Sequence, residues 1–243
     1  MNNLKIFLSL CWIIIYFSFS IITFPTITAA ENNTIKIGYI DYTGFIDKKP
    51  DGSYSGYGVD YLTQISRSTG WKYEFIYDSW DTQLKNLKEG SIDFLCHAQI
   101  TPERQKNYLF SKNSIGYEHN IVYAALNSNY YYNDYQMFNG MNIAFLAGSS
   151  QNDQFLEWSK MHNFFYTSNL YPTEEAAFDA LNNNYVDAVV MGSLSNQKGY
   201  KIIGKFDYEP FYFMTSKQNK ELLIALDNAI TNIKVSNPSF EFL

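Results

Sequence analysis

Short apolar runs alternate with stretches of helical periodicity from residue 34 onward, a pattern typical of α/β proteins. Apolar or alternating runs predict strands at residues 35–40, 71–77, 92–96, 121–126, 141–146, 164–167, 186–191 and 209–215. Apolar positions at helical spacing predict helices at residues 57–69, 81–89, 151–161, 172–183 and 221–233, with a short one from Thr101. Strands that follow one another across such helices are expected to pair in parallel.

The first thirty residues predict an export signal. Lys5 precedes an apolar run over residues 6–24, and Thr28-Ala29-Ala30 follows as a cleavage site, with cleavage after Ala30. Because the apolar run is nearly as long as a membrane span, an uncleaved anchor is the alternative. In both cases we expect the remaining chain outside the cytoplasm, periplasmic or extracellular and associated with the cell surface.

Composition predicts a globular protein that does not bind nucleic acid. Hydrophobic residues make up 46% of the 243 residues and aromatic residues 18%, which argues against long disorder. Lys and Arg number 18 against 24 Asp and Glu, and no basic cluster follows the start of the chain. This charge disfavours nucleic acid and anionic membrane surfaces as partners. After cleavage Cys96 is the only cysteine, so no intrachain disulfide is expected.

Three helices are expected to begin directly after buried strands: near Thr101, near Ser149-Ser150 and after Met191. In open α/β sheets such helix starts bind ligands, because their free amides and positive ends face the crevice at the strand ends. Arg104 lies one turn into the first of these helices. A guanidinium beside free amides is suited to binding a carboxylate through two parallel hydrogen bonds.

The sequence carries no recognisable catalytic or metal-binding pattern. G-x-S-x-G, H-E-x-x-H and C-x-x-C are all absent, and the histidines, His97, His119 and His162, are too scattered to suggest a metal site. We therefore expect a binding protein without a cofactor or metal, and not an enzyme.

Several segments together resemble one family. Ile-Thr-Pro-Glu-Arg at 100–104, followed by Leu-Phe-Ser at 109–111, resembles the T-x-x-R … F-S segment of family 3 extracellular solute-binding proteins. These are the polar amino-acid binders of transport systems and their relatives in sensor proteins. The segment at 37–60 is similar to the family's opening, 84–93 to its L-x-x-G-x-x-D element and 187–189 to its D-A-V strand. The resemblance covers residues 35–240.

The resemblance implies a two-lobed, periplasmic-binding-protein-like fold of type II. Each lobe is expected to be a mixed, mostly parallel sheet flanked by helices, and two crossover strands join the lobes. Residues 31–124 and 209–243 are expected to form lobe 1, and residues 125–208 to form lobe 2. In this family the ligand is enclosed when the lobes close.

Positions on lobe 1 can be matched to the family's ligand site. By resemblance, Arg104 binds the α-carboxylate of the ligand, with Gln99 and His97 beside it. Tyr42 and Trp80 match aromatic residues that pack on the ligand side chain.

Lobe 2 matches the family less completely. Ser149 and Ser150 match the turn that donates amides to the carboxylate. The acidic residue that binds the ligand ammonium follows the D-A-V strand in the family, but this chain has Gly192 there. An enclosed ammonium without an anionic partner is costly. Either Asp41 or Asp81 substitutes, or the ligand lacks a cation, or the site recognises a partner instead of a solute.

The expected function is extracytoplasmic binding of a small polar solute, an amino acid or another carboxylate, by closure of two lobes. The solute then enters ABC-type uptake through a membrane permease or is reported to a membrane-bound sensor. The alternative is a sensory or interaction domain with a degenerate cleft, and an enzyme on the same scaffold is the third hypothesis.

Overall fold

The computed structural model describes residues 33–40, 42–195, 197–238 and 240. The predicted signal peptide, residues 1–30, lies outside the described residues, and so does Asp41. Among the described residues, no helix is both long enough and apolar enough to cross a membrane.

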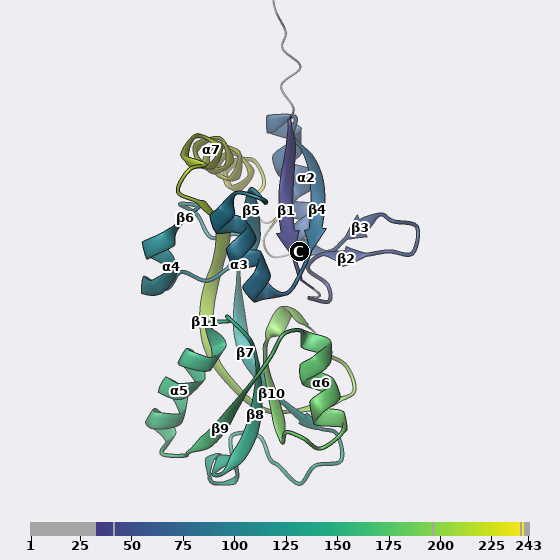
Figure 1. The fold of residues 1–243 in the computed structure, drawn as a ribbon, viewed down its shortest axis with the longest axis vertical. Helices are drawn as coiled ribbons and strands as arrows, with labels where there is room; N and C mark the ends of the chain where they lie inside the picture. Colours follow the sequence, from purple (N-terminus) through teal and green to yellow (C-terminus); the bar gives the residue numbers. More distant parts are fainter. Residues whose placement is uncertain (1–32, 41, 196, 239, 241–243) are drawn as a thin grey trace, which may run out of the picture. The chain divides into compact units, whose positions relative to one another are not determined.

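The first lobe is built from strand–helix–strand units (Figure 1). Its elements, before the chain first passes to the second lobe, are β1 (Thr34–Tyr39), β2 (Asp47–Lys48), β3 (Tyr54–Ser55), α2 (Tyr57–Thr69), β4 (Lys72–Tyr77), α3 (Trp80–Glu89), β5 (Phe94–Ala98), α4 (Pro102–Asn107) and β6 (Tyr108–Phe110). β1 pairs in parallel with both β4 and β5. The small β2–β3 hairpin lies between the predicted strand at 35–40 and the predicted helix at 57–69. The predicted helices at 57–69 and 81–89 are confirmed.

Local signals explain where these helices begin and end. Gly70 ends α2 and Gly90 ends α3, both in the left-handed conformation that glycine adopts without strain. The side chain of Ser79 caps α3 by accepting from the amide of Thr82. α4 follows Thr101, whose hydroxyl accepts from the amide of Arg104 at 3.1 Å. The sequence therefore fixes the position of Arg104 one turn into a helix.

The second lobe repeats the α/β pattern. It contains η1 (Tyr135–Phe138), β8 (Met141–Leu146), α5 (Gln151–His162), β9 (Tyr166–Tyr171), α6 (Glu174–Asn182), β10 (Ala188–Gly192) and η2 (Ser193–Ser195). β8 lies between β9 and β10 and is parallel to both. The predicted strand at 141–146 and helix at 151–161 are confirmed. The helix predicted at 172–183 is present as α6, and Thr173 caps it by accepting from the amide of Ala176.

Two long antiparallel strands connect the lobes. β7 (Gly116–Ala125) pairs along its length with β11 (Tyr200–Ser216), which continues to pair with β5 and β6. The sheet order is therefore β4-β1-β5-β11-β7-β10-β8-β9, and α7 (Lys220–Ser236) packs against α2. Both strands are longer than the predicted runs at 121–126 and 209–215. The apolar pattern missed the start of β7 because Glu118, His119 and Asn120 interrupt it.

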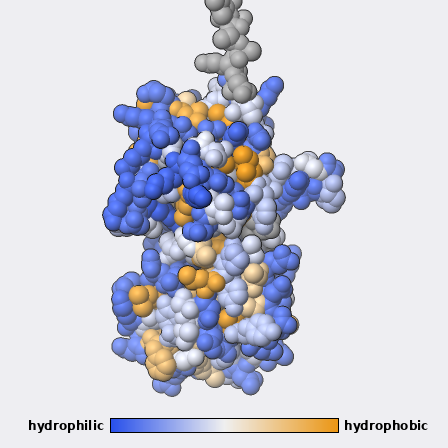
Figure 2. Space-filling view, in the orientation of Figure 1, coloured by the Kyte–Doolittle hydropathy of each residue, from blue (hydrophilic) through white to orange (hydrophobic). Residues whose placement is uncertain are grey.

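Packed apolar clusters support this frame. One cluster joins β1, α2 and α7, and another fills the second lobe between β8, α5 and the N-terminal part of β11. A further cluster includes Trp80 of the first lobe together with Leu146 and Met191 of the second. The face seen in Figure 2 is largely hydrophilic with small apolar patches. The lobes thus share apolar packing beside the strand ends at which the candidate site lies.

Candidate ligand-binding site

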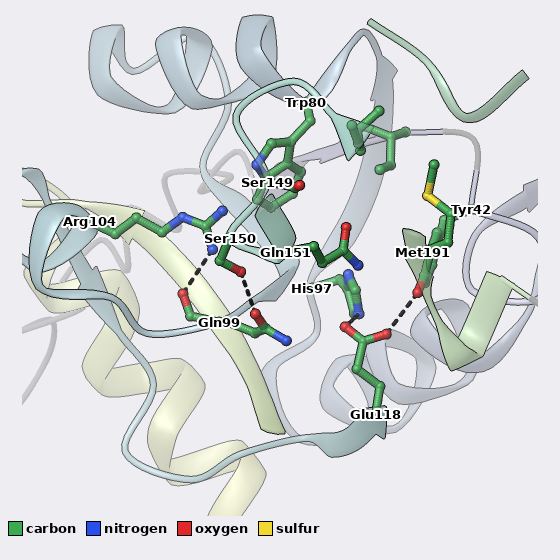
Figure 3. A pocket seen from close by; sticks show the side chains of 12 residues that line it. Tyr42, Trp80, His97, Gln99, Arg104, Glu118, Ser149, Ser150, Gln151 and Met191 are labelled. Atoms are coloured by element: carbon green, nitrogen blue, oxygen red, sulfur yellow. Dashed lines mark hydrogen bonds and ion pairs between the residues drawn. The ribbon is translucent and has the colours of Figure 1, made fainter. Parts of the chain in front are cut away.

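A pocket lies where the carboxyl ends of strands from both lobes meet (Figure 3). It is lined by Ile40, Tyr42, Trp80, His97, Gln99, Arg104, Glu118, Leu146, Ser149, Ser150, Gln151 and Met191. Most of these residues follow or end strands β1, β4, β5, β8 and β10. Carboxyl ends of strands are where open α/β sheets bind ligands.

Arg104 provides the pocket with a buried cation. Only 8% of the residue is exposed, and burial lowers the pKa of its guanidinium to about 10. At that pKa the group still carries its charge at neutral pH. Nη1 donates to the carbonyl oxygen of Gln99 at 2.9 Å and Nη2 to that of Gly148 at 3.1 Å. The guanidinium has five N–H donors, so these two bonds orient the group and leave donors for an anion.

Trp80 fixes the other side of the guanidinium. The Cζ atom of Arg104 lies 5.2 Å from the centroid of the Trp80 ring, a cation–π arrangement. Nε1 of Trp80 donates to the carbonyl oxygen of Gly148 at 3.0 Å. The indole is thus held by a hydrogen bond at its polar edge and presents its face to the cation.

A chain of polar side chains crosses from the first lobe to the second. Oε1 of Gln99 accepts from the hydroxyl of Ser150 and from Nε2 of Gln154, the latter at 3.2 Å. Gln154 in turn accepts from Nδ2 of Asn120 at 2.8 Å. Ser149 is adjacent, and its buried hydroxyl has no hydrogen-bond partner among the described residues. The turn before α5 therefore brings both serines to the pocket.

Glu118 on β7 provides a buried acid on the pocket wall. Its side chain is 1% exposed, and Oε2 accepts a hydrogen bond of 2.7 Å from the hydroxyl of Tyr42. Nε2 of His97 lies 2.8 Å from Oε1, an ion-pair distance without the alignment of a hydrogen bond. Burial, and then the charge and hydrogen bonding of Glu118, raise the pKa of Tyr42 well above its usual range. Tyr42 therefore acts as a hydroxyl donor.

Gly192 is the one predicted site residue that does not line the pocket. The structure brings the others together: Tyr42, Trp80, His97, Gln99, Arg104, Ser149 and Ser150. Gly192 lies beside Glu118 and Tyr42 at the end of β10. Whether each of these side chains contacts a ligand stays a prediction.

Sequence reasoning missed Glu118, which is the only acidic side chain among the described residues that line this pocket. Asp81, one of the acids expected to substitute at the site, is not part of the lining. The available signal was that Glu118 comes just before the predicted strand at 121–126. That position does not reveal that this strand pairs with the one that ends at Gly192. Gln151 and Met191 were also missed. Among the described residues, no group of three or more His, Cys, Asp or Glu is placed to hold a metal ion.

Comparisons with solved structures show the same fold. A substrate-binding protein of an ABC uptake transporter from Streptococcus pneumoniae, with bound histidine, is 21% identical with a TM-score of 0.74, over 86% of this chain and 89% of that chain. An ancestral arginine-binding protein bound to arginine is 24% identical with a TM-score of 0.71, over 86% and 95%. An ancestral amino-acid-binding protein, a precursor of cyclohexadienyl dehydratase, is 21% identical with a TM-score of 0.72, over 87% and 93%.

Two sequence comparisons were informative in different ways. The search of curated protein sequences found no significant match. The family model described as bacterial extracellular solute-binding proteins, family 3, matches residues 35–238. With the two-lobed α/β fold and the pocket at the strand ends, this match shows that the chain belongs to family 3 of the bacterial extracellular solute-binding proteins.

Proposed function

We propose that the protein binds a small polar solute that carries a carboxylate, outside the cytoplasm, by closure of its two lobes. The bound solute is then delivered to a membrane permease of the ABC type or reported to a membrane-bound sensor. The observation that carries this proposal is the buried, charged Arg104 in a pocket whose walls come from both lobes.

Arg104 is suited to a carboxylate because a planar guanidinium forms two parallel N–H···O bonds with it. Its bonds to the carbonyl oxygens of Gln99 and Gly148 fix the plane of the group before a ligand arrives. Burial strengthens the attraction for an anion, because the pocket screens charge less than water does.

The start of α5 supports the same ligand class from the second lobe. Ser149 and Ser150 precede this helix, whose first amides have no partners within the helix. The positive end of a helix favours a negative group. A carboxylate between Arg104 and this turn contacts both lobes and therefore stabilises the closed arrangement.

The proposed closure requires movement about the strands that connect the lobes. We propose that lobe 1 comprises residues 31–124 and 209–243 and lobe 2 residues 125–208, with β7 and β11 as the connection. Residues 120–124 pair with β10 of lobe 2, which favours a crossing earlier in β7, before residue 120. The polar bridge from Gln99 to Ser150 joins the two sides directly.

An amino acid or another carboxylate is the proposed ligand. The similar structures include one with histidine and one with arginine bound, which supports an amino acid. We propose binding without catalysis, and export directed by the predicted signal at residues 1–30.

Thermal-shift screening tests this function. The library contains the twenty common L-amino acids, 2-hydroxy acids, dicarboxylates and small polyols, and hits are measured by calorimetry. Carboxylates are expected to raise the melting temperature and polyols to leave it unchanged. NMR of the hit after prolonged incubation with the protein is expected to show no turnover.

The matched variants are Arg104→Ala and Arg67→Ala, the latter removing an exposed guanidinium on α2. Arg104→Ala is expected to weaken binding at least about a hundredfold, and Arg67→Ala to leave it unchanged. Equal binding by both variants refutes the anchor role of Arg104. A screen without hits favours a sensory or interaction domain with a degenerate cleft.

A further inference from the structure

Gly192 leaves a space that Glu118 occupies. Gly192 ends β10 and pairs with Asn120 of β7, and Glu118 lies two residues away on the same face of that strand. A Cβ atom on Gly192 would lie 1.9 Å from Oε2 of Glu118 and 2.0 Å from the hydroxyl oxygen of Tyr42. No side chain at position 192 is compatible with the present position of this carboxylate.

The carboxylate of Glu118 is only partly satisfied by the protein. Tyr42 donates one hydrogen bond to it, and the nearby Nε2 of His97 is not aligned to donate a second. An ionised carboxylate offers about four lone-pair sites. A buried charge with unfilled acceptor sites is costly in a pocket unless a further cation or donor binds there.

Arg104 and Glu118 present opposite charges to one pocket. Figure 3 shows them on opposite sides of the labelled side chains, with Ser150 and Gln151 between. Glu118 is the only acid and Arg104 the only arginine or lysine among the described residues of the lining. A solute that carries both a carboxylate and a cationic nitrogen matches this pair of charges, whereas a plain carboxylate leaves Glu118 unmatched.

We propose that Glu118, reaching from β7 into the space left by Gly192, binds a cationic nitrogen of the ligand, so that the solute is a zwitterion. This inference rests on the proposed function, in which Arg104 binds the carboxylate. Tyr42 positions the Glu118 carboxylate through its hydrogen bond to Oε2, and Nε2 of His97 lies 2.8 Å from Oε1.

Matched pairs of probes separate the two charges. Each pair has the same carboxylate and side chain but differs in the nitrogen: L-alanine and L-lactate, L-aspartate and L-malate, L-phenylalanine and L-phenyllactate. Calorimetry measures all six with the wild type, with Glu118→Gln and with Glu74→Gln, which alters an exposed glutamate on β4 in the same way. The Glu118→Gln change keeps the shape of the side chain and an oxygen that accepts from Tyr42.

In at least one pair the wild type is expected to bind the amino acid much more tightly than the hydroxy acid. Glu118→Gln should weaken binding of that amino acid about thirtyfold or more and change binding of the hydroxy acid less than about threefold. Glu74→Gln should change neither. A purely structural role for Glu118 predicts equal losses for both members of the pair.

The double variant Glu118→Gly with Gly192→Asp places the acid on β10 instead of β7. Its carboxylate would then lie near the space that Glu118 occupies in the wild type. Recovery of the preference for the amino acid supports the inference, and a folded variant without recovery counts against it. If the double variant does not fold, the calorimetry of Glu118→Gln with the paired probes decides whether the inference holds.

Failure of this inference is distinguishable from failure of the proposed function. Carboxylate binding that depends on Arg104 but is equal for amino and hydroxy acids overturns the role of Glu118 and leaves the proposed function standing. The same holds if Glu118→Gln retains full discrimination. No binding by any of the six probes or the wider carboxylate library overturns both.

Discussion

Arg104 in the first lobe donates to the carbonyl oxygen of Gly148 in the second at 3.1 Å. The same oxygen accepts from Nε1 of Trp80 at 3.0 Å. One backbone carbonyl therefore holds both the guanidinium and the ring against which it lies. This contact joins the proposed carboxylate anchor in the first lobe to the turn before α5 in the second.

Gly148→Ala is predicted to weaken both stability and ligand binding. Gly148 has a φ of +74°, and a Cβ atom there would lie 3.2 Å from both Oδ1 of Asp81 and Cδ1 of Trp80. The strain should cost about 1 kcal/mol of unfolding free energy, and displacement of the carbonyl should weaken binding several-fold. Urea unfolding and calorimetry measure the two effects.

The control is Gly52→Ala in the β2–β3 hairpin. Gly52 has a φ of +83°, but no atom beyond its chain neighbours lies within 4 Å of its Cβ position. It should show the backbone cost alone, with unchanged binding. If the two variants behave alike in binding, the Gly148 carbonyl does not position Arg104.

Gly192→Ala is predicted to lower the unfolding free energy by about 1–3 kcal/mol, because its Cβ atom overlaps Glu118 and Tyr42. Glu118→Ala removes the overlapping carboxylate. The double variant should therefore be more stable than the sum of the single changes predicts, and urea unfolding of all four proteins measures this coupling. Additive effects would contradict the steric relationship between Gly192 and Glu118.

Cys96 is predicted to be inert in the folded protein. The residue is 2% exposed, and burial raises the pKa of the thiol, so little nucleophilic thiolate forms. A colorimetric thiol reagent at about pH 8 should not react with Cys96 until denaturant is added. Comparison with Cys96→Ala shows how much of the colour comes from Cys96. Rapid reaction of Cys96 in the native protein would contradict the prediction and show that β5 opens readily.

Asp207→Asn is predicted to stabilise the protein at pH 7. Asp207 lies in an irregularity of β11 with a φ of 48°, a conformation that asparagine also tolerates, and burial raises the pKa of its carboxyl. The folded state thus holds the proton more tightly than the unfolded chain, whose carboxyl keeps the ordinary value of 3.8. Ionisation therefore costs stability above the folded pKa, and this cost disappears as the pH falls below 3.8.

Because the group is partly exposed, the expected gain is only a few tenths of a kcal/mol at pH 7. It should shrink as the pH is lowered toward 3.8, and urea unfolding at pH 7 and pH 4 tests this. Asp51→Asn should not stabilise, because hydrogen bonds from Ser53 lower the pKa of that carboxyl. A gain at Asp207 that does not depend on pH would show that charge is not its cause.

The sequence determined most elements and the position of Arg104 because their signals are local. Thr101 and Pro102 start α4 within one turn of Arg104, and Gly70 and Gly90 end their helices through their own backbone freedom. Apolar periodicity likewise fixed the types of most strands and helices. Each of these signals lies within a few residues of the feature that it specifies.

Only the tertiary structure decided which acid lies at the site. Glu118 belongs to a part of β7 that apolar periodicity did not detect, since Glu118, His119 and Asn120 interrupt the apolar run. Its relation to Gly192 depends on the antiparallel register of β7 and β10, whose residues are distant in the chain. Register between such strands is set by packing of the whole sheet, which no local pattern encodes.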